Sequence, residues 1–433
     1  RAHALQLAPM MDVTDAHFRE LCRLMSARAA LYTEMVVGTT ITRGAERVVE
    51  RELWLPDAHV AERQTVLQLG GSDPATLAAA ARRAAPYGYA ELNLNVGCPS
   101  DKVAGAGAFG ASLMLRPAAV GDCCAAMADA SGLPVSVKCR LGVDDVETYA
   151  ALADFVGVVA ERGGVQRFIV HARRAILGGL TPEQNRSVPP LRHERVRALA
   201  RDFPALAFSA NGGVGGCHAA AAELARNAPA GGAGGATGGA DQEEFEGVAS
   251  PNHLTDLPPL EGVMVGRGPW KAPWEAIGDA DRAVHGVPNR AASRRALLLD
   301  YAEYCATTQA RFETKPDGHE VPSARVLLRP VLNIFKGEPG TAKWKRFMDD
   351  ELRVAKARRG EGRRPPMPRA RDVLLRALDA GLVPDDVLDA PPSACATARA
   401  AAGEAGAAAR VSIDAAVWDA AEMPELPELT LSA

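Results

Sequence analysis

In Asn93-Leu94-Asn95-Val96-Gly97-Cys98-Pro99-Ser100, a single thiol directly follows an apolar run, residues 90–96, that is typical of a buried strand. In a barrel of parallel strands, the residues at the carboxyl ends of the strands face the active site. A cysteine at that place, followed by the stiff Pro99 and a Ser-Asp pair that favours a helix start, is positioned for chemistry. The alternative is a small buried hydrophobic residue, the commonest fate of an isolated cysteine.

Seven other apolar runs alternate with helical patterns in the same way. The eight strand-like runs are residues 5–10, 30–35, 65–69, 90–96, 134–140, 167–171, 207–211 and 262–265. Apolar residues recur at helical spacing between them, as in residues 74–87, 116–130, 146–162 and 193–202. Eightfold alternation of strand and helix predicts an α/β fold, a TIM (β/α)8 barrel. A doubly wound open sheet is the structural alternative, but no GxGxxG follows the first strand.

The chain is long enough for a barrel, which takes ~250 residues, and for a second, smaller domain. We predict the barrel over residues 1–290, with a flexible Gly/Ala-rich insertion at about 227–259 that buries too little surface to become ordered. We then predict a helical bundle over residues 291–382 and an Ala-rich, poorly ordered tail over residues 383–433. The four expected bundle helices span residues 291–309, 323–335, 342–357 and 369–380.

Charge is unevenly distributed along the chain. Residues 294–371 contain 18 Lys and Arg against 10 Asp and Glu, whereas the whole chain has a net charge of −4. A basic segment next to an acidic body indicates either a polyanionic partner or a solvated helical surface.

The eight cysteines form no CxxC pair and have no His companion at metal-ligand spacing. We therefore expect no zinc site, no structural disulfide and a reducing compartment. The adjacent Cys123 and Cys124 are expected in the core of a helix. No run of about 18 apolar residues exists, so we expect no membrane span. A targeting segment is not visible, and the expected compartment is the cytoplasm or an organelle, either plastid or mitochondrion.

Polar residues at several strand ends predict a binding site on one face of the barrel. Glycines after the seventh and eighth strands, together with Arg267, suit a phosphate group. Above this phosphate, the amide of Gln68, the amine of Lys138 and the imidazole of His171 would line a flat ring. In a flavin, Lys138 would lie near the pyrimidine edge of that ring. FMN fits better than a dinucleotide, whose fingerprint is missing. The residues concerned are Gln68, Lys138, Arg140, His171, Asn211, Gly212, Gly213, Gly266 and Arg267.

Several motifs resemble those of the tRNA-dihydrouridine synthases, in the same order and at similar spacing. These are Ala8-Pro9-Met10-Met11-Asp12-Val13-Thr14-Asp15, Leu31-Tyr32-Thr33-Glu34-Met35, Gln68-Leu69-Gly70-Gly71-Ser72, Leu92-Asn93-Leu94-Asn95-Val96-Gly97-Cys98-Pro99-Ser100 and Ile169-Val170-His171-Ala172-Arg173. Others resemble the dihydrouridine synthase A branch, the tRNA-dihydrouridine(20/20a) synthases. These are Leu180-Thr181-Pro182, Asn185-Arg186, Pro189-Pro190-Leu191 and Phe335-Lys336-Gly337-Glu338-Pro339-Gly340 ahead of Trp344. The resemblance covers roughly residues 5–382, interrupted by the insertion.

The resemblance implies an FMN enzyme that uses NADPH to reduce D-loop uridines of tRNA, at positions 20 and 20a. It implies that reduced flavin gives hydride to C6 of the uracil and that Cys98 protonates C5. Asn95 would help to hold the uracil, while Arg173 and Arg186 would contact tRNA. Implied flavin contacts are Pro9, Met10, Met11, Gln68, Lys138, His171, Asn211, Gly212, Gly213, Gly266 and Arg267.

The basic helical domain would bind the tRNA backbone, and the protein is expected to be a monomer. Its candidate phosphate contacts are Arg329, Lys336, Lys343, Lys345 and Arg346.

Three other functions remain open on the residues alone. An FMN-dependent dihydropyrimidine or dihydroorotate-type dehydrogenase acting on a free base would explain Cys98 and the phosphate site, but would leave the basic bundle without a role. An aldolase-type barrel would use Lys138 as a Schiff-base nucleophile. A catalytically silent RNA-binding protein would not need Cys98.

Overall fold

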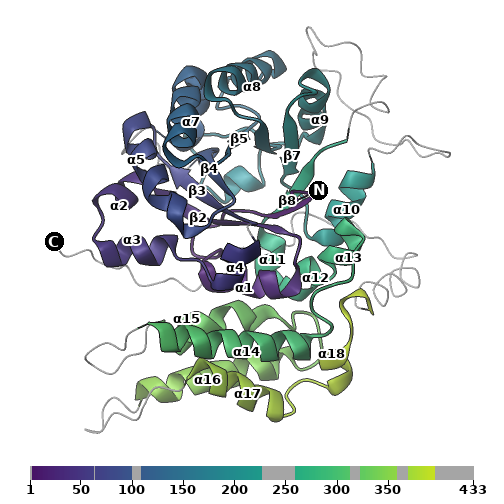
Figure 1. Cartoon of the computed structure of the whole chain (residues 1–433). Coiled ribbons are helices and arrows are strands. Elements are labelled where there is room, and N and C mark those ends of the chain that lie inside the picture. The colour runs from purple at the N-terminus through teal and green to yellow at the C-terminus, as the bar shows by residue number, and fades with distance from the viewer. Residues whose placement is uncertain are drawn as a thin grey trace, which may run out of the picture. The chain divides into compact units, whose positions relative to one another are not determined.

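A computed structural model describes residues 2–62, 64–99, 109–226, 259–312, 322–357 and 369–394. Within them, eight parallel strands close into a barrel in sequence order, each hydrogen-bonded to the next and β8 to β1 (Figure 1). The predicted TIM barrel is thereby confirmed. The strands are β1 (Leu5–Leu7), β2 (Ala30–Val37), β3 (Thr65–Gly70), β4 (Glu91–Val96), β5 (Val135–Arg140), β6 (Arg167–His171), β7 (Ala207–Asn211) and β8 (Gly262–Val265). Strand β1 is shorter than predicted because Pro9 has no N–H to donate to a neighbouring strand.

Helices surround the strands, as Figure 1 shows. Helices α1, α5 and α8 begin after Asp15, Asp73 and Thr148, whose side chains accept hydrogen bonds from backbone N–H groups of the first turn. These N–H groups have no hydrogen-bond partner within the helix itself. The helices of this part are α1 (Ala16–Met25), α2 (Gly38–Arg43), α3 (Glu46–Leu53), α4 (Asp57–Glu62), α5 (Pro74–Ala84), α7 (Pro117–Ser131), α8 (Tyr149–Gly163), α9 (His193–Asp202), α10 (Cys217–Ala225), α11 (Arg267–Lys271), α12 (Pro273–Ile277) and α13 (Ala280–His285). Short 3-10 helices are η1 (Ala85–Tyr87), η2 (Gly110–Leu115) and η3 (Gln184–Arg186).

Further helices follow the barrel along the chain: α14 (Arg294–Arg311), α15 (Ala324–Leu328), η5 (Arg329–Asn333), α16 (Thr341–Ala357), α17 (Ala370–Asp379) and α18 (Asp385–Asp389). The single helix expected at 323–335 is divided, because Pro330 cannot donate the hydrogen bond that would continue α15. Leu5 and Phe18 of the barrel part belong to the same apolar cluster as Leu297 and Phe335. The described residues therefore pack as one compact unit, and the boundary at residue 290 stays a prediction.

The structure differs from the predicted tail at its first residues. Helix α18 lies within residues 383–394, and Val387 and Leu388 are buried. The Arg294 guanidinium donates to the Val387 carbonyl oxygen at 3.0 Å, and Arg295 pairs with Asp385 and Asp389. The remainder of the predicted tail and the Gly/Ala-rich insertion lie outside the described residues, apart from residue 259 of the insertion. No helix of the described ranges has both the length and the apolar character that a membrane crossing requires.

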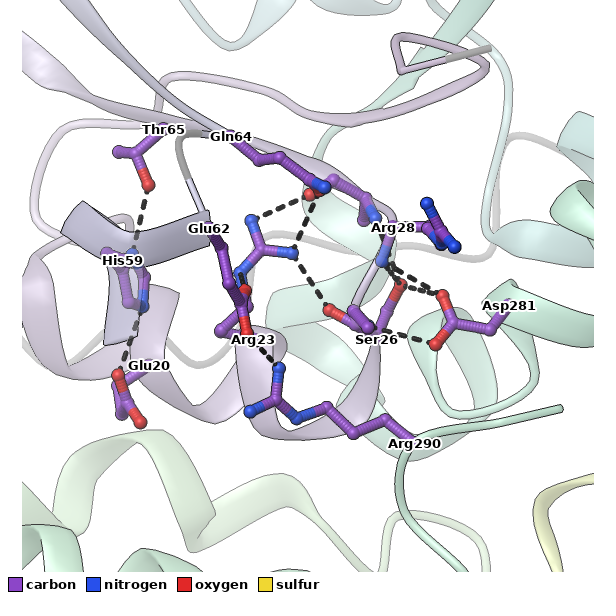
Figure 2. A network of polar contacts seen from close by, with 12 residues as sticks. Glu20, Arg23, Ser26, Arg28, His59, Glu62, Gln64, Thr65, Asp281 and Arg290 are labelled. Carbon is purple, nitrogen blue, oxygen red and sulfur yellow. Dashed lines mark hydrogen bonds and ion pairs between the residues drawn. The ribbon is translucent and has the colours of Figure 1, made fainter. Parts of the chain in front are cut away.

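A buried polar network lies at the amino ends of strands β2 and β3 (Figure 2). His59 contacts Glu20 and Thr65, both at 3.0 Å, and burial lowers its pKa. Arg23 pairs with Glu62 at 2.9 Å, and Asp281 accepts from the Ser26 hydroxyl at 2.6 Å. Because this is the barrel end opposite the catalytic one, we interpret the network as stabilising the fold.

Candidate active site

Cys98 follows β4 directly, at the carboxyl end of the barrel, and is half-buried. The six other cysteines that the structure describes are buried, and burial raises the pKa of each of these six thiols. The expectation that Cys123 and Cys124 are core residues of a helix is confirmed. Within the described part of the chain, Cys98 is therefore the thiol best placed to meet a substrate.

The turn that carries Cys98 is held from two sides. The side-chain oxygen of Asn95 accepts the backbone N–H groups of Gly97 and Cys98, at 3.1 and 3.0 Å. The carbonyl oxygen of Gly97 accepts from Nε of Arg140 at 3.0 Å, and that of Cys98 accepts from the Ala111 N–H at 2.9 Å. The backbone around the sulfur is thus fixed before any ligand arrives.

Arg140 has a structural role that sequence reasoning did not assign to it. Besides Gly97, its guanidinium donates to the carbonyl oxygens of Arg174, at 3.1 Å, and Asn185, at 2.7 Å. It is buried, and this burial lowers its pKa to about 10. Arg140 therefore ties the Cys98 turn to the segment after β6. Its charge at the end of β5 was visible in the sequence, but its three carbonyl partners were not.

Positive charge gathers around the Cys98 turn. Burial, followed by the neighbouring Arg140, lowers the pKa of Lys138 to about 8, and the same two causes lower that of His171 well below its usual range. Burial and the nearby Arg267 also lower the pKa of Arg173 and Arg186. Among the described residues, none of Lys138, Arg140, Arg173 and Arg186 forms an ion pair with a carboxylate, so this region suits an anionic ligand.

A glycine cradle lies after β7, where the sequence predicted a phosphate site. Gly212 and Gly213 have φ of +104° and +73°, which other residues rarely adopt. A Cβ on Gly212 would lie 2.7 Å from the His171 ring, and one on Gly213 would lie 2.5 Å from Leu191. Beside them, Nζ of Lys138 donates to the side-chain oxygen of Asn211 at 3.1 Å. A phosphate group binds where backbone N–H groups are not covered by side chains and where nearby cations have no carboxylate partner. The described residues of this region meet both conditions, so they fit a phosphate-bearing cofactor such as FMN.

The other predicted site residues lie as follows. Gln68 is buried at the end of β3. In the first loop, Met10 is half-buried, and Met11 is 58% exposed. Gly266 immediately precedes α11, and Arg267, its first residue, lies 4.0 Å from Glu183. Arg173 donates to the Pro189 carbonyl oxygen. Arg329, a predicted phosphate contact, pairs with Asp15 at 3.1 Å, and its guanidinium lies over the ring of Trp270.

Glu34 is a titratable group at the same barrel end that sequence reasoning missed. It lies in a β-bulge, because the pairing of β2 with β3 shifts between Tyr32 and Met35. Burial and the nearby Asp15 raise its pKa to about 7, while the backbone of Asp12, at φ +61°, donates a hydrogen bond to it. In the sequence, Glu34 stood out only as part of the motif Leu31-Tyr32-Thr33-Glu34-Met35, and no chemistry was assigned to it.

We expect Glu34→Gln to flatten the pH dependence of stability. The folded state holds a proton on Glu34 up to about pH 7, whereas the unfolded chain releases it near 4.5. The wild-type unfolding free energy therefore falls as pH rises between these values, and the variant lacks this fall. The unfolding free energy of the variant minus that of wild type should therefore rise by about 1–3 kcal/mol from about pH 4 to about pH 8. Urea unfolding across this range measures the gain. The exposed Glu50→Gln is the control, and parallel curves for both variants would contradict the assignment.

Comparisons with known proteins place the chain among tRNA-modifying enzymes. The family described as dihydrouridine synthase (Dus) matches residues 6–235. The tRNA-dihydrouridine(20/20a) synthase of Escherichia coli O6:H1 is 37% identical over 82% of this chain and 92% of its own length. Proteins with the same name from Vibrio vulnificus and Xanthomonas campestris pv. campestris are 36% and 39% identical. These cover 80% and 78% of this chain, and 90% and 84% of their own lengths.

Proposed function

The chain belongs to the dihydrouridine synthase family, and from this premise we propose how its own residues carry out the reaction. It is a tRNA-dihydrouridine synthase, an oxidoreductase that uses FMN and NADPH to saturate the C5–C6 bond of uridines in tRNA. The observation that carries the proposal is the half-buried Cys98 in a rigid turn beside a cationic, glycine-lined site. Family membership decides against the aldolase and the silent RNA-binding alternatives.

The cofactor would be held by the residues after β7 and β8. Backbone N–H groups of Gly212 and Gly213 would approach its phosphate, and Arg267 would supply a positive charge. Asn211 and Gly266 border this cradle. Gln68, Lys138 and His171 would face the ring system, with Pro9, Met10 and Met11 closing it from the first loop. FMN, when bound, supplies the hydride that adds to C6 of the uracil.

Cys98 would give its proton to C5 of the uracil as the new bond at C6 forms. The double bond then becomes a single bond with one hydrogen added at each carbon. The sulfur becomes negatively charged in this step, and the nearby cations Lys138, Arg140 and Arg186 would stabilise that charge. A proton from solvent restores the thiol, since Cys98 is only half-buried.

The substrate base must leave its stack to reach Cys98, at a cost of a few kcal/mol. This cost would be lower for D-loop uridines, because they are already partly unstacked. Asn95 would hold the base, while Arg173 and Arg186 contact the surrounding tRNA. The basic helices after the barrel would hold backbone phosphates. We therefore propose D-loop uridines 20 and 20a as the targets of a monomeric enzyme.

Mapping of the modified positions tests this proposal. The purified protein, supplied with FMN, NADPH and an unmodified tRNA transcript, should form dihydrouridine at positions 20 and 20a. Mass spectrometry of nuclease fragments locates the product. Dihydrouridine elsewhere would refute the proposed targets. Reduction of free uracil or dihydroorotate chemistry at comparable kcat/KM would instead favour the free-base dehydrogenase.

A further inference from the structure

The glycine cradle after β7 is in contact with a histidine that belongs to no predicted site. His193 is the first residue of α9, and its Nε2 lies 2.8 Å from the carbonyl oxygen of Gly212. Leu191, two residues earlier, also touches the cradle, because a Cβ on Gly212 or on Gly213 would lie 3.1 or 2.5 Å from its side chain. The start of α9 is therefore packed directly against the two glycines.

The hydrogen bond to Gly212 has a fixed direction. A carbonyl oxygen can only accept, so Nε2 of His193 must carry the proton. The other ring nitrogen, Nδ1, lies 3.4 Å from the buried carboxylate of Glu223, which also pairs with Arg197 and, at 3.2 Å, with Arg226. The hydrogen bond from His193 is the largest of the causes that lower the pKa of Glu223 to about 2. An ionised Glu223 thus holds the imidazole from behind while Nε2 holds the cradle.

The peptide group between Gly212 and Gly213 needs such a contact to keep one direction. A planar trans peptide points its carbonyl oxygen and its N–H in opposite directions. The two glycines have φ of +104° and +73° and no Cβ, so they place little steric restraint on rotation of the peptide between them. After half a turn, this peptide would present its oxygen where its N–H had been, and an oxygen repels an anion. His193 attracts the oxygen and so opposes that rotation.

The Gly213 N–H points away from His193 as a consequence. Among the residues that the structure describes, this N–H has no hydrogen-bond partner. A backbone donor without a partner favours a ligand that accepts, and a phosphate oxygen is a strong acceptor. The side of the cradle opposite His193 is thus the side prepared for an anion.

We propose that His193 is a positioning residue that aims the Gly213 N–H at the phosphate of FMN, and so favours FMN over riboflavin, which lacks this phosphate. The inference rests on the proposed function, in which Gly212 and Gly213 hold the phosphate. His193 acts through the Gly212 carbonyl and does not touch the cofactor. Its effect is therefore confined to the phosphate end, and the ring contacts proposed for Gln68 do not depend on it.

The test measures the dissociation constants of FMN and of riboflavin for the full chain after its flavin has been removed, by the change in flavin fluorescence. The quantity of interest is the preference for FMN, the riboflavin constant divided by the FMN constant. His193→Leu removes the donor at similar volume and should lower this preference roughly 10- to 100-fold, with riboflavin binding unchanged. His193→Gln places an amide N–H near the position of Nε2 and should keep the preference within roughly threefold of wild type.

His218→Leu is the matched control. His218 lies on α10, the helix that carries Glu223, and pairs with the buried Asp279 at 3.2 Å, which lies outside the cradle. Its replacement should leave the preference for FMN at the wild-type value. The proposal is overturned if His193→Leu keeps the wild-type preference, if it weakens FMN and riboflavin binding equally, or if His218→Leu lowers the preference as much.

Arg267→Gln separates this proposal from the proposed function. In that function Arg267 supplies positive charge to the phosphate, so its replacement should also lower the preference for FMN. A lowered preference in Arg267→Gln alone would refute the role of His193 and leave the cradle in place. An unchanged preference in both Arg267→Gln and His193→Leu would mean that the phosphate binds elsewhere, and would refute the proposed cradle together with the role of His193.

Discussion

Replacing Cys98 by alanine is expected to lower dihydrouridine formation in tRNA by roughly 10²- to 10⁴-fold, the range of a lost general acid. FMN content and NADPH oxidation should stay close to wild type, because the glycine cradle and the cations around it do not depend on the sulfur. Steady-state assays of NADPH oxidation, together with mass spectrometry of the tRNA, separate the two activities.

Cys123→Ala supplies the matched control, since Cys123 is a buried thiol of helix α7. It should form dihydrouridine at the wild-type rate. Dihydrouridine formation at that same rate by Cys98→Ala would show that another group protonates C5.

The second large effect is expected for Arg140→Met. This change removes a charged donor from the carbonyl oxygens of Gly97, Arg174 and Asn185, which are left without that partner. We expect the unfolding free energy to fall by about 2–5 kcal/mol, because hydrogen bonds to charged groups contribute about 1.5–3 kcal/mol each and are not additive. The rate of tRNA reduction should fall roughly 10- to 100-fold even well below the Tm, because the Cys98 turn is no longer held.

Arg162→Met is the control for this variant. Arg162 makes a two-pronged ion pair with Asp122, but both groups are exposed. Stability and activity should change little, as is usual for surface ion pairs. A reduction rate for Arg140→Met that matches Arg162→Met at low temperature would show that the clamp on Gly97 does not contribute to catalysis.

The sequence predicted the barrel well because its strands are short apolar runs bounded by turn residues. Strand β6 (Arg167–His171) and strand β7 (Ala207–Asn211) begin and end where the pattern changes. Proline positions explain the differences: Pro9 ends β1 early, and Pro330 interrupts a helix. Helix α18 was missed because Arg294 and Arg295, far away in sequence, supply the contacts that hold it.

The site was predictable only as far as strand ends determine it. Cys98, Lys138 and His171 follow from their places at the ends of β4, β5 and β6. The buried hydrogen bonds that link Gln68 with Asn93 and Asn95, and Asn93 with Ser136, were not visible, because they depend on which residues face each other across three strands. The pairing of Arg329 with Asp15 joins residues 314 positions apart, and no local pattern indicates it.

The most direct measurement starts from enzyme whose flavin has been reduced by NADPH in the absence of oxygen. On rapid mixing with unmodified tRNA, the yellow absorption of oxidised flavin should return quickly in wild type, with one dihydrouridine formed per flavin. It should return far more slowly with Cys98→Ala, and not at all with free uracil. Equal rates for the two proteins, or a return with free uracil as fast as with tRNA, would contradict the assignment of Cys98 as the proton donor to a tRNA uridine.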